Sequence, residues 1–210
     1  MKIALFGATG GTGRQLIRQA CEAGDEVTAV VRDPARLTES HPHLTVLRGD
    51  VTDPATLRPA IEGCDAVVSA LGSRDGRVPT TVCAAGTAGI AQAMRIVRVR
   101  RLVVVSAGTL TTEGDGPLTR LIMKPLLGNL LKHTIADKRR MEEVVRASGL
   151  EWTIVRPPML TDGPHTGAYR SAVDRNVRGA LRVSRADLAD CILQCLLHNE
   201  PINAAVSIGY

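Results

Sequence analysis

Residues 3–13, IALFGATGGTG, decide how the rest of the chain is interpreted. The apolar run Ile3–Phe6 predicts a buried strand, and the apolar spacing of residues 16–21 predicts a helix directly after the glycines. At such a turn Gly7 permits the tight bend, Gly10 lets the backbone approach a pyrophosphate, and Gly13 lets the helix pack on the strand. The free N–H groups of the helix then attract phosphate. The stretch therefore predicts a dinucleotide site, against the alternative of a glycine-rich turn without a ligand.

Composition narrows the class of protein further. The chain has 210 residues, of which 44% are hydrophobic, and this suits one domain with a sizeable core. Only four residues are aromatic, which argues against stacking of single-stranded nucleic acid, so no nucleic-acid partner is expected. The net charge of +5 is spread along the chain and suits an anionic ligand.

Location and cysteine use point the same way. No apolar run approaches the about 20 residues of a membrane span, and the chain starts directly on a strand rather than on a signal peptide. The five cysteines form no Cys-x-x-Cys pair, so we expect reduced thiols and no metal site. We therefore expect a cytoplasmic protein.

Strand and helix patterns alternate along the whole chain. They predict an α/β fold, a single-domain Rossmann doubly wound parallel sheet covering residues 1–210. The expected strands after the first lie at 27–31, 44–47, 66–70, 102–105, 151–155 and 204–208. The expected helices lie at 54–61, 80–97, 135–147 and after a capping box of Ser184 with Asp187.

The end of the second strand indicates which dinucleotide is bound. Arg32 stands at the strand end and Arg36 lies about one helical turn later. Two guanidinium groups suit the 2′-phosphate of NADP, whereas an acidic residue there favours NAD, and Asp33 keeps NAD possible. The other interpretation is a pair of solvated surface arginines.

The ends of the other strands should point into the same crevice. We expect Asp50 and Val51 at the adenine, and Leu71, Gly72 and Arg74 along the middle of the cofactor. Ser106 follows the fifth strand and is placed beside the nicotinamide, unless it is a structural strand-end serine.

Two long segments are expected on the substrate side, at 109–133 and 159–179. Residues 109–117 predict a flexible loop and residues 161–179 an irregular stretch. The leucine-rich segment 118–131 could be a lid, a dimer contact or a membrane-touching segment, and we favour a lid or packed helical insert. The arginines at 95, 98, 100 and 101 predict a solvated helix end.

The assembled motifs resemble a known family. GATGGTG at 7–13, Gly49-Asp50-Val51, Val105-Ser106-Ala107 and Val155-Arg156-Pro157-Pro158 resemble the atypical short-chain dehydrogenase/reductases with NAD(P)H-binding, NmrA-like domains. Further stretches at 32–36, 71–74, 79–82 and 166–169 are most similar to the biliverdin-IXβ reductases, also called NADPH flavin reductases. The resemblance covers nearly the whole chain.

The resemblance implies a set of roles. Pyrophosphate contacts are implied for Gly7, Thr9, Gly10 and Thr12, and 2′-phosphate contacts for Arg32 and Arg36. It implies Ser106 at the reaction centre and the cofactor contacts already named at the strand ends. It also implies that the nicotinamide is flanked by Pro158, Met159 and Leu160.

The chain departs from the family pattern at two positions. Where short-chain dehydrogenases carry Tyr-x-x-x-Lys, this chain has Thr134 and Lys138. Lys138 can still hold the nicotinamide ribose or lower a neighbouring pKa, but a threonine is a poor proton donor. Met159 stands where the biliverdin enzyme has a histidine, and segment 118–131 is longer than its counterpart.

These features favour an oxidoreductase that transfers hydride from NADPH to a flavin, quinone or tetrapyrrole-like acceptor. Such a conjugated acceptor spreads the developing charge, so it needs no dedicated tyrosine acid. The alternative is a non-catalytic, NmrA-like NAD(P) sensor that binds a protein partner through residues 95–101 and 118–131. A sugar-nucleotide epimerase or dehydratase is a third alternative, which the short chain disfavours. The oligomeric state is left open between monomer and homodimer.

Overall fold

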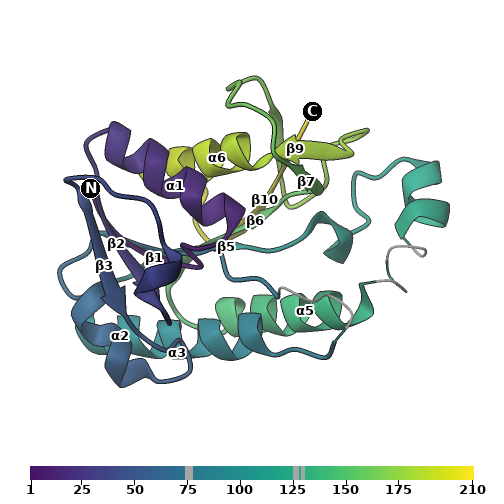
Figure 1. Cartoon of the computed structure of the whole chain (residues 1–210). Helices are drawn as coiled ribbons and strands as arrows, with labels where there is room; N and C mark the ends of the chain where they lie inside the picture. Colours follow the sequence, from purple (N-terminus) through teal and green to yellow (C-terminus); the bar gives the residue numbers. More distant parts are fainter. Residues whose placement is uncertain (74–77, 125–127, 129–130) are drawn as a thin grey trace.

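The computed structural model describes residues 1–73, 78–124, 128 and 131–210, and an eight-stranded sheet forms its centre (Figure 1). The strand order is β3-β2-β1-β4-β5-β6-β10-β8, and every pairing is parallel except that of β8 with β10. The predicted doubly wound parallel sheet is therefore confirmed. Its strands are β1 Lys2–Phe6, β2 Glu26–Val31, β3 Leu44–Arg48, β4 Ala66–Ser69, β5 Arg101–Val105, β6 Glu151–Arg156, β8 Arg170–Val173 and β10 Ala204–Gly209.

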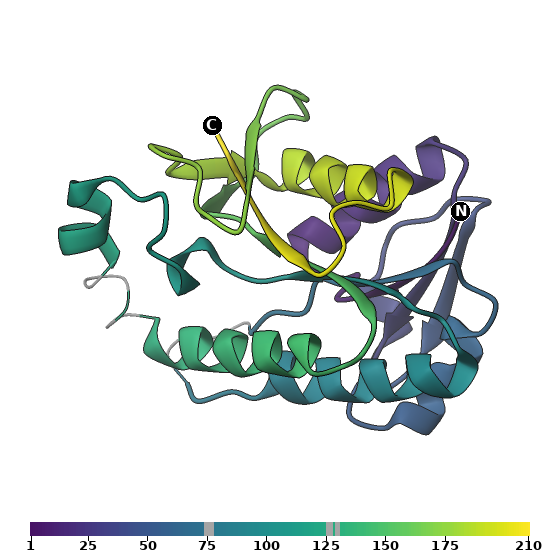
Figure 2. The ribbon, with the colours of Figure 1, turned by 180° about the vertical axis from the view of Figure 1, so that it is seen from behind.

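Helices cover both faces of the sheet, as Figures 1 and 2 show. One face carries α1 (Gly11–Glu22) and α6 (Arg185–Leu197), which pack against each other. The other carries α2 (Pro54–Ile61), α3 (Val82–Val97) and α5 (Lys132–Arg146). Each face has its own apolar core, so the molecule has three layers.

The sheet changes direction between β1 and β4. From β1 the chain winds outward through β2 to β3, and it then returns to place β4 on the other side of β1. The helices that follow β1 and β4 lie on opposite faces, so the carboxyl ends of these two strands border a crevice. The glycine-rich turn lies at this point.

The prediction of an irregular stretch at 161–179 is wrong in part. Residues Met159–Thr161 form β7, which pairs with β9 (Arg182–Ser184), and β8 lies inside the stretch. These strands are three or four residues long, which is too short to carry an apolar alternation that a sequence pattern could reveal.

Two short helical turns lie at 109–133, one at the start of the predicted loop 109–117 and one in the predicted insert 118–131. Gly108–Leu110 forms a 3-10 helix, and Thr119–Met123 forms a π-helical turn. Within the predicted insert, residues 125–127 and 129–130 lie outside the described residues. The lid, dimer and membrane alternatives for 118–131 stay predictions; in the described chain no helix has the length and apolarity to cross a bilayer.

The arginine cluster before β5 is not uniformly solvated, which corrects the sequence interpretation. Arg101 is only 6% exposed, and its guanidinium donates to the Thr153 hydroxyl and to the main-chain oxygen of Cys195. Arg100 is exposed and pairs with Glu151 at 3.0 Å. Arg101, which faces inward, therefore connects β5 to β6 and α6 through hydrogen bonds.

Half of the predicted capping box at α6 is confirmed. The Ser184 hydroxyl accepts a hydrogen bond from the Asp187 amide at 2.9 Å. The Asp187 carboxylate does not return the bond; it accepts from Thr166, Gly167 and the Tyr210 hydroxyl. Burial alone would raise the pKa of Asp187, but these hydrogen bonds outweigh it and lower the pKa to about 2.

Candidate functional site

Two glycines of the first turn leave no room for a side chain. Gly7 has a φ of +82°, and a Cβ there would lie 2.4 Å from the Ala70 carbonyl oxygen after β4. A Cβ on Gly13 would lie 2.3 Å from the Gly7 oxygen. The expected tight turn at Gly7 and the close helix packing at Gly13 are thus both present.

The first turn of α1 is open to an anion. Its cap residue is Gly10, which has no side chain to bond the free amides, and its first turn contains no acidic residue. The uncompensated N–H groups and the positive end of the helix dipole remain available where the phosphate is expected. Thr9 and Thr12 flank Gly10 in this turn, and Thr12 is buried.

The end of β2 presents two exposed cationic side chains. Arg32 and Arg36 are exposed, and neither guanidinium forms a hydrogen bond with another residue of the described chain. The nearby Asp33 carboxylate instead accepts from the Ala35 amide at 3.1 Å, so it caps its own short helix. The acidic residue that kept NAD possible is therefore engaged locally.

Sequence reasoning missed Arg14, which joins the glycine turn to this region. Its guanidinium donates to the Thr38 hydroxyl and to Glu39, both at 3.1 Å, and to the Arg36 carbonyl at 3.3 Å. The only indication of this role in the sequence was that Arg14 directly follows Gly13. Its partners lie in a separate loop, which a sequence pattern does not reveal.

Asp50 and Val51 lie at the end of β3, as expected for an adenine contact. The Asp50 carboxylate accepts from the amide and hydroxyl of Thr52, at 2.9 Å and 2.7 Å, and these bonds lower the Asp50 pKa. Val51 and Leu71 both pack against Gly86 of α3, where a Cβ would lie 2.9 Å and 2.7 Å from their side chains. The fold therefore brings these two predicted contacts together.

The middle of the expected cofactor path is partly described. A Cβ on Gly72 would meet nothing within 4 Å, so the backbone there is open. Arg74 lies outside the described residues. Sequence reasoning missed Gly86 and Gly89 in α3, where glycines inside a helix were a signal of close backbone approach.

Lys138 links the ends of two neighbouring strands. It is 6% exposed, and its ammonium donates to the Leu71 carbonyl at 2.9 Å and to the Val105 carbonyl. An ammonium has three N–H donors, so one remains beyond these two bonds. One turn earlier, the Thr134 hydroxyl is buried and has no hydrogen-bond partner among the described residues.

Ser106 lies at the end of β5 in a buried network. Its hydroxyl donates to Glu142 Oε1 at 2.6 Å, and the Glu142 carboxylate is also held by two nitrogens of the Arg156 guanidinium. Burial alone would raise the Glu142 pKa, but the bonds from Arg156 and Ser106 prevail and lower it. Sequence reasoning named neither Glu142 nor Arg156; the i, i+4 spacing of Glu142 from Lys138 was a usable signal.

The residues after β6 differ in exposure. Met159 is 65% exposed, Pro158 and Leu160 are half-buried, and Leu160 packs on the core of the α1 and α6 face. The amide of Gly108, after β5, donates to the Pro157 carbonyl at 2.8 Å. The ends of β5 and β6 are thereby fastened side by side.

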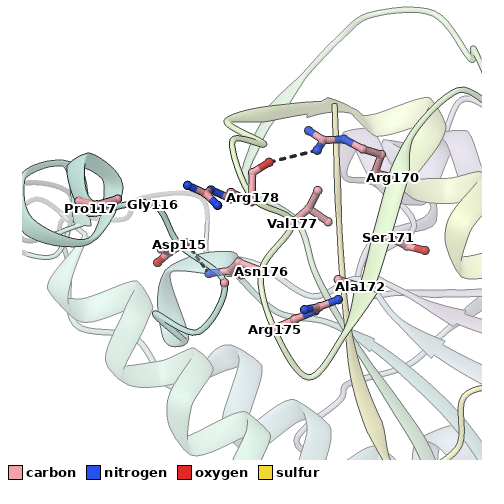
Figure 3. A pocket seen from close by; sticks show the side chains of 11 residues that line it. Asp115, Gly116, Pro117, Arg170, Ser171, Ala172, Arg175, Asn176, Val177 and Arg178 are labelled. Carbon is pink, nitrogen blue, oxygen red and sulfur yellow. Dashed lines mark hydrogen bonds between the residues drawn. The ribbon is translucent and has the colours of Figure 1, made fainter.

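Both predicted substrate-side segments line one open pocket of about 690 Å³ (Figure 3). One wall is residues 114–117, and the other runs from Arg170 to Arg178. Asn176 joins the walls, because its side-chain amide donates to Asp115 and to the carbonyls of Gly108 and Thr111. The pocket is therefore connected through Gly108 to the ends of β5 and β6.

The geometry defines a Rossmann-fold dinucleotide-binding protein. The chain matches the NAD(P)H-binding family over residues 7–199. It is 30% identical to the Bacillus subtilis protein YwnB, with 99% of this chain and 98% of that protein aligned. The chain belongs to this NAD(P)H-binding, NmrA-like family, as its motifs predicted.

Two further comparisons extend the likeness. The chain is 29% identical to Reductase pytE of Aspergillus terreus, over 99% of this chain and 97% of that protein. A short-chain dehydrogenase/reductase of Veillonella parvula, solved in complex with NADP, has the same fold with a TM-score of 0.79. That structure is 21% identical and covers 100% of this chain and 94% of its own. The described residues contain no group of three His, Cys, Asp or Glu side chains able to hold a metal.

Proposed function

We propose that the protein is an NADPH-dependent reductase that transfers hydride to a conjugated acceptor such as a flavin, a quinone or a tetrapyrrole. The observation that carries the proposal is the position of Lys138: it anchors the ends of β4 and β5, while Thr134 occupies the place of a tyrosine acid. Reduction of an ordinary ketone needs a proton at the developing alkoxide. A conjugated acceptor spreads that charge and takes its proton from solvent.

The chain's own residues bind and orient the reactants. The amides at the start of α1 hold the pyrophosphate, and Arg32 and Arg36 hold the 2′-phosphate. Bound NADPH supplies the hydride. Lys138 directs its remaining N–H to the nicotinamide ribose, and Pro158, Met159 and Leu160 flank the nicotinamide. Glu142 and Arg156 fix Ser106 at the reaction centre. A relative named as a reductase supports this assignment.

The proposal is tested by following NADPH oxidation against FMN, riboflavin, a quinone and biliverdin, with NADH in parallel. Turnover with any acceptor establishes a reductase. Tight NADPH binding without turnover favours the sensor instead, for which the exposed Leu118 and Leu121, 65% and 72% accessible, offer a partner surface. A pull-down that depends on the dinucleotide then distinguishes the sensor from an inactive enzyme.

Replacing Arg32 by alanine should raise the KM for NADPH by about 10-fold or more, because a hydrogen bond to a charged group is worth about 1.5–3 kcal/mol. The KM for NADH should change less than twofold, since NADH lacks the 2′-phosphate. Arg58→Ala, an exposed arginine of α2, removes the same charge and serves as control. Equal effects of Arg32→Ala on both cofactors would rule out NADPH selection at this position.

The pocket charge predicts a preference among acceptors. Arg170, Arg175 and Arg178 line it, and its single acidic residue, Asp115, is paired with Lys124. FMN carries a phosphate that riboflavin lacks, while both carry the same reacting ring. We expect the double variant Arg175→Glu/Arg178→Glu to lower kcat/KM for FMN about 10-fold or more and to leave riboflavin within twofold.

The matched control for this charge change is the double variant Arg18→Glu/Arg58→Glu, at two exposed arginines of α1 and α2 outside the pocket. Steady-state rates with both flavins give the comparison. A parallel loss with FMN and riboflavin would mean that the arginines maintain the pocket and do not recognise charge.

A further inference from the structure

Arg185 lies across the first turn of α1. It is the first residue of α6, and its side chain passes directly over Gly11: a Cβ on Gly11 would lie 2.6 Å from Arg185 Cδ and 2.9 Å from Arg185 Nε. Gly11 has no positive φ, so the turn itself does not require a glycine there. The missing side chain instead leaves the space that Arg185 fills.

This position is electrostatically unfavourable for a cation. Arg185 stands at the start of α6 and beside the start of α1, and the amino end of a helix carries partial positive charge. A cation at such an end is destabilised by that partial charge. The first turn of α6 contains Asp187, but the first turn of α1 contains no acidic side chain to offset the charge there.

One carboxylate holds the guanidinium in place. Arg185 Nη1 lies 2.5 Å from Asp162 Oδ1, just after β7. The Asp162 side chain is 89% exposed, and an ion pair this accessible to solvent contributes little to stability. This exposed pair is therefore weak, and at the α1 end the guanidinium can leave Asp162 for a stronger anion at little cost.

We propose that Arg185 is a pyrophosphate-binding residue. When the dinucleotide occupies the glycine turn, the guanidinium leaves Asp162 and binds a pyrophosphate oxygen beside the amides of α1. An arginine fork suits phosphate oxygens because it offers two parallel N–H donors. The cofactor is then held from the first helix and from the last, on one face of the sheet.

The test measures dissociation constants by calorimetry for NADPH and for ADP, which retains the pyrophosphate. Arg185→Gln should weaken both by about 10-fold or more, the value for a charged hydrogen bond. Arg185→Lys should restore part of the loss, since it keeps the charge and loses the fork. Thermal melting of the free proteins verifies that each variant folds.

Asp162→Asn provides the decisive comparison, because it breaks the same ion pair and leaves Arg185 free. The proposal predicts NADPH binding equal to or tighter than that of the unmodified protein. If Arg185 only stabilises the fold through Asp162, the two variants should weaken NADPH binding equally. That result, or an Arg185→Gln variant that binds NADPH and ADP within twofold of the unmodified protein, would overturn the proposal.

Discussion

Gly7→Ala should abolish measurable NADPH binding and destabilise the protein by more than about 4 kcal/mol, in the range of severe core disruption. The new methyl group would lie 2.4 Å from the oxygen and 2.5 Å from the carbon of the Ala70 carbonyl. Both atoms are backbone, so relief requires the ends of β1 and β4 to separate. These ends border the crevice in which the dinucleotide is expected.

The matched control is Gly24→Ala. Gly24 has a φ of +85°, close to the +82° of Gly7, but a Cβ there meets nothing within 4 Å. It should cost only the left-handed backbone strain of about 1–2 kcal/mol and leave NADPH binding unchanged. Similar losses at both positions would show that backbone strain, and not the approach of β4, explains the Gly7 effect.

A second variant keeps the binding claim testable if Gly7→Ala does not fold. A Cβ on Gly10 would have its nearest neighbour, the Gly7 oxygen, at 3.3 Å, so the free protein has nearly enough room for it. Gly10→Ala should therefore fold and yet bind NADPH much more weakly, because its methyl group occupies the approach of the pyrophosphate. Calorimetry on the folded variant gives the answer.

Glu142→Ala should lower the free energy of unfolding by about 3–5 kcal/mol, the cost of breaking a buried ion pair. It leaves the Arg156 guanidinium, 9% exposed at its side chain, without its carboxylate and removes the acceptor of the Ser106 hydroxyl. Chemical denaturation measures the loss. Glu143→Ala, the exposed neighbour on α5, should change stability by less than about 0.5 kcal/mol.

The pH dependence of this contribution has a definite sign. The folded pKa of Glu142 lies below its usual value, so its stabilisation is complete above the unfolded pKa of about 4.3. The stabilisation is lost as pH falls through the lower folded pKa. As pH falls from neutral to acid, the free energy of unfolding of the Glu142→Ala variant should therefore decrease less than that of the unmodified protein. If the variant lost as much stability in acid as the unmodified protein, a lowered pKa for Glu142 would be contradicted.

Local sequence patterns were sufficient to predict the long strands of the sheet and the helices that cover it. The buried positions of α1 are Thr12, Gly13, Leu16, Ile17, Ala20 and Cys21, which follow the helical spacing that predicted it. Long buried strands also carry a clear apolar signal. The short strands β7, β8 and β9 do not, because three or four residues are too few to show a periodic pattern.

The same limit applies to the candidate site. Asp137 was passed over in the sequence, yet its carboxylate accepts from the amides of Cys83 and Ala84 and caps α3 from another helix. Arg185 and Asn176 likewise act on segments distant in sequence. The glycine turn could be predicted because the positive φ of Gly7 and the contact of Gly13 with Gly7 are local requirements. The contacts of Asp137, Arg185 and Asn176, like the approach of Ala70 to Gly7, exist only after the layers have packed.

A reductase of the kind proposed passes hydride from bound NADPH to a conjugated acceptor without a protein partner. The most direct measurement mixes the NADPH-loaded protein with FMN anaerobically and follows both chromophores in a single turnover. Nicotinamide and flavin absorbance should fall together, one equivalent of NADPH for each equivalent of FMN. Stable absorbance of both, across the acceptor panel and with NADPH binding confirmed by calorimetry, would contradict the reductase and favour the dinucleotide sensor.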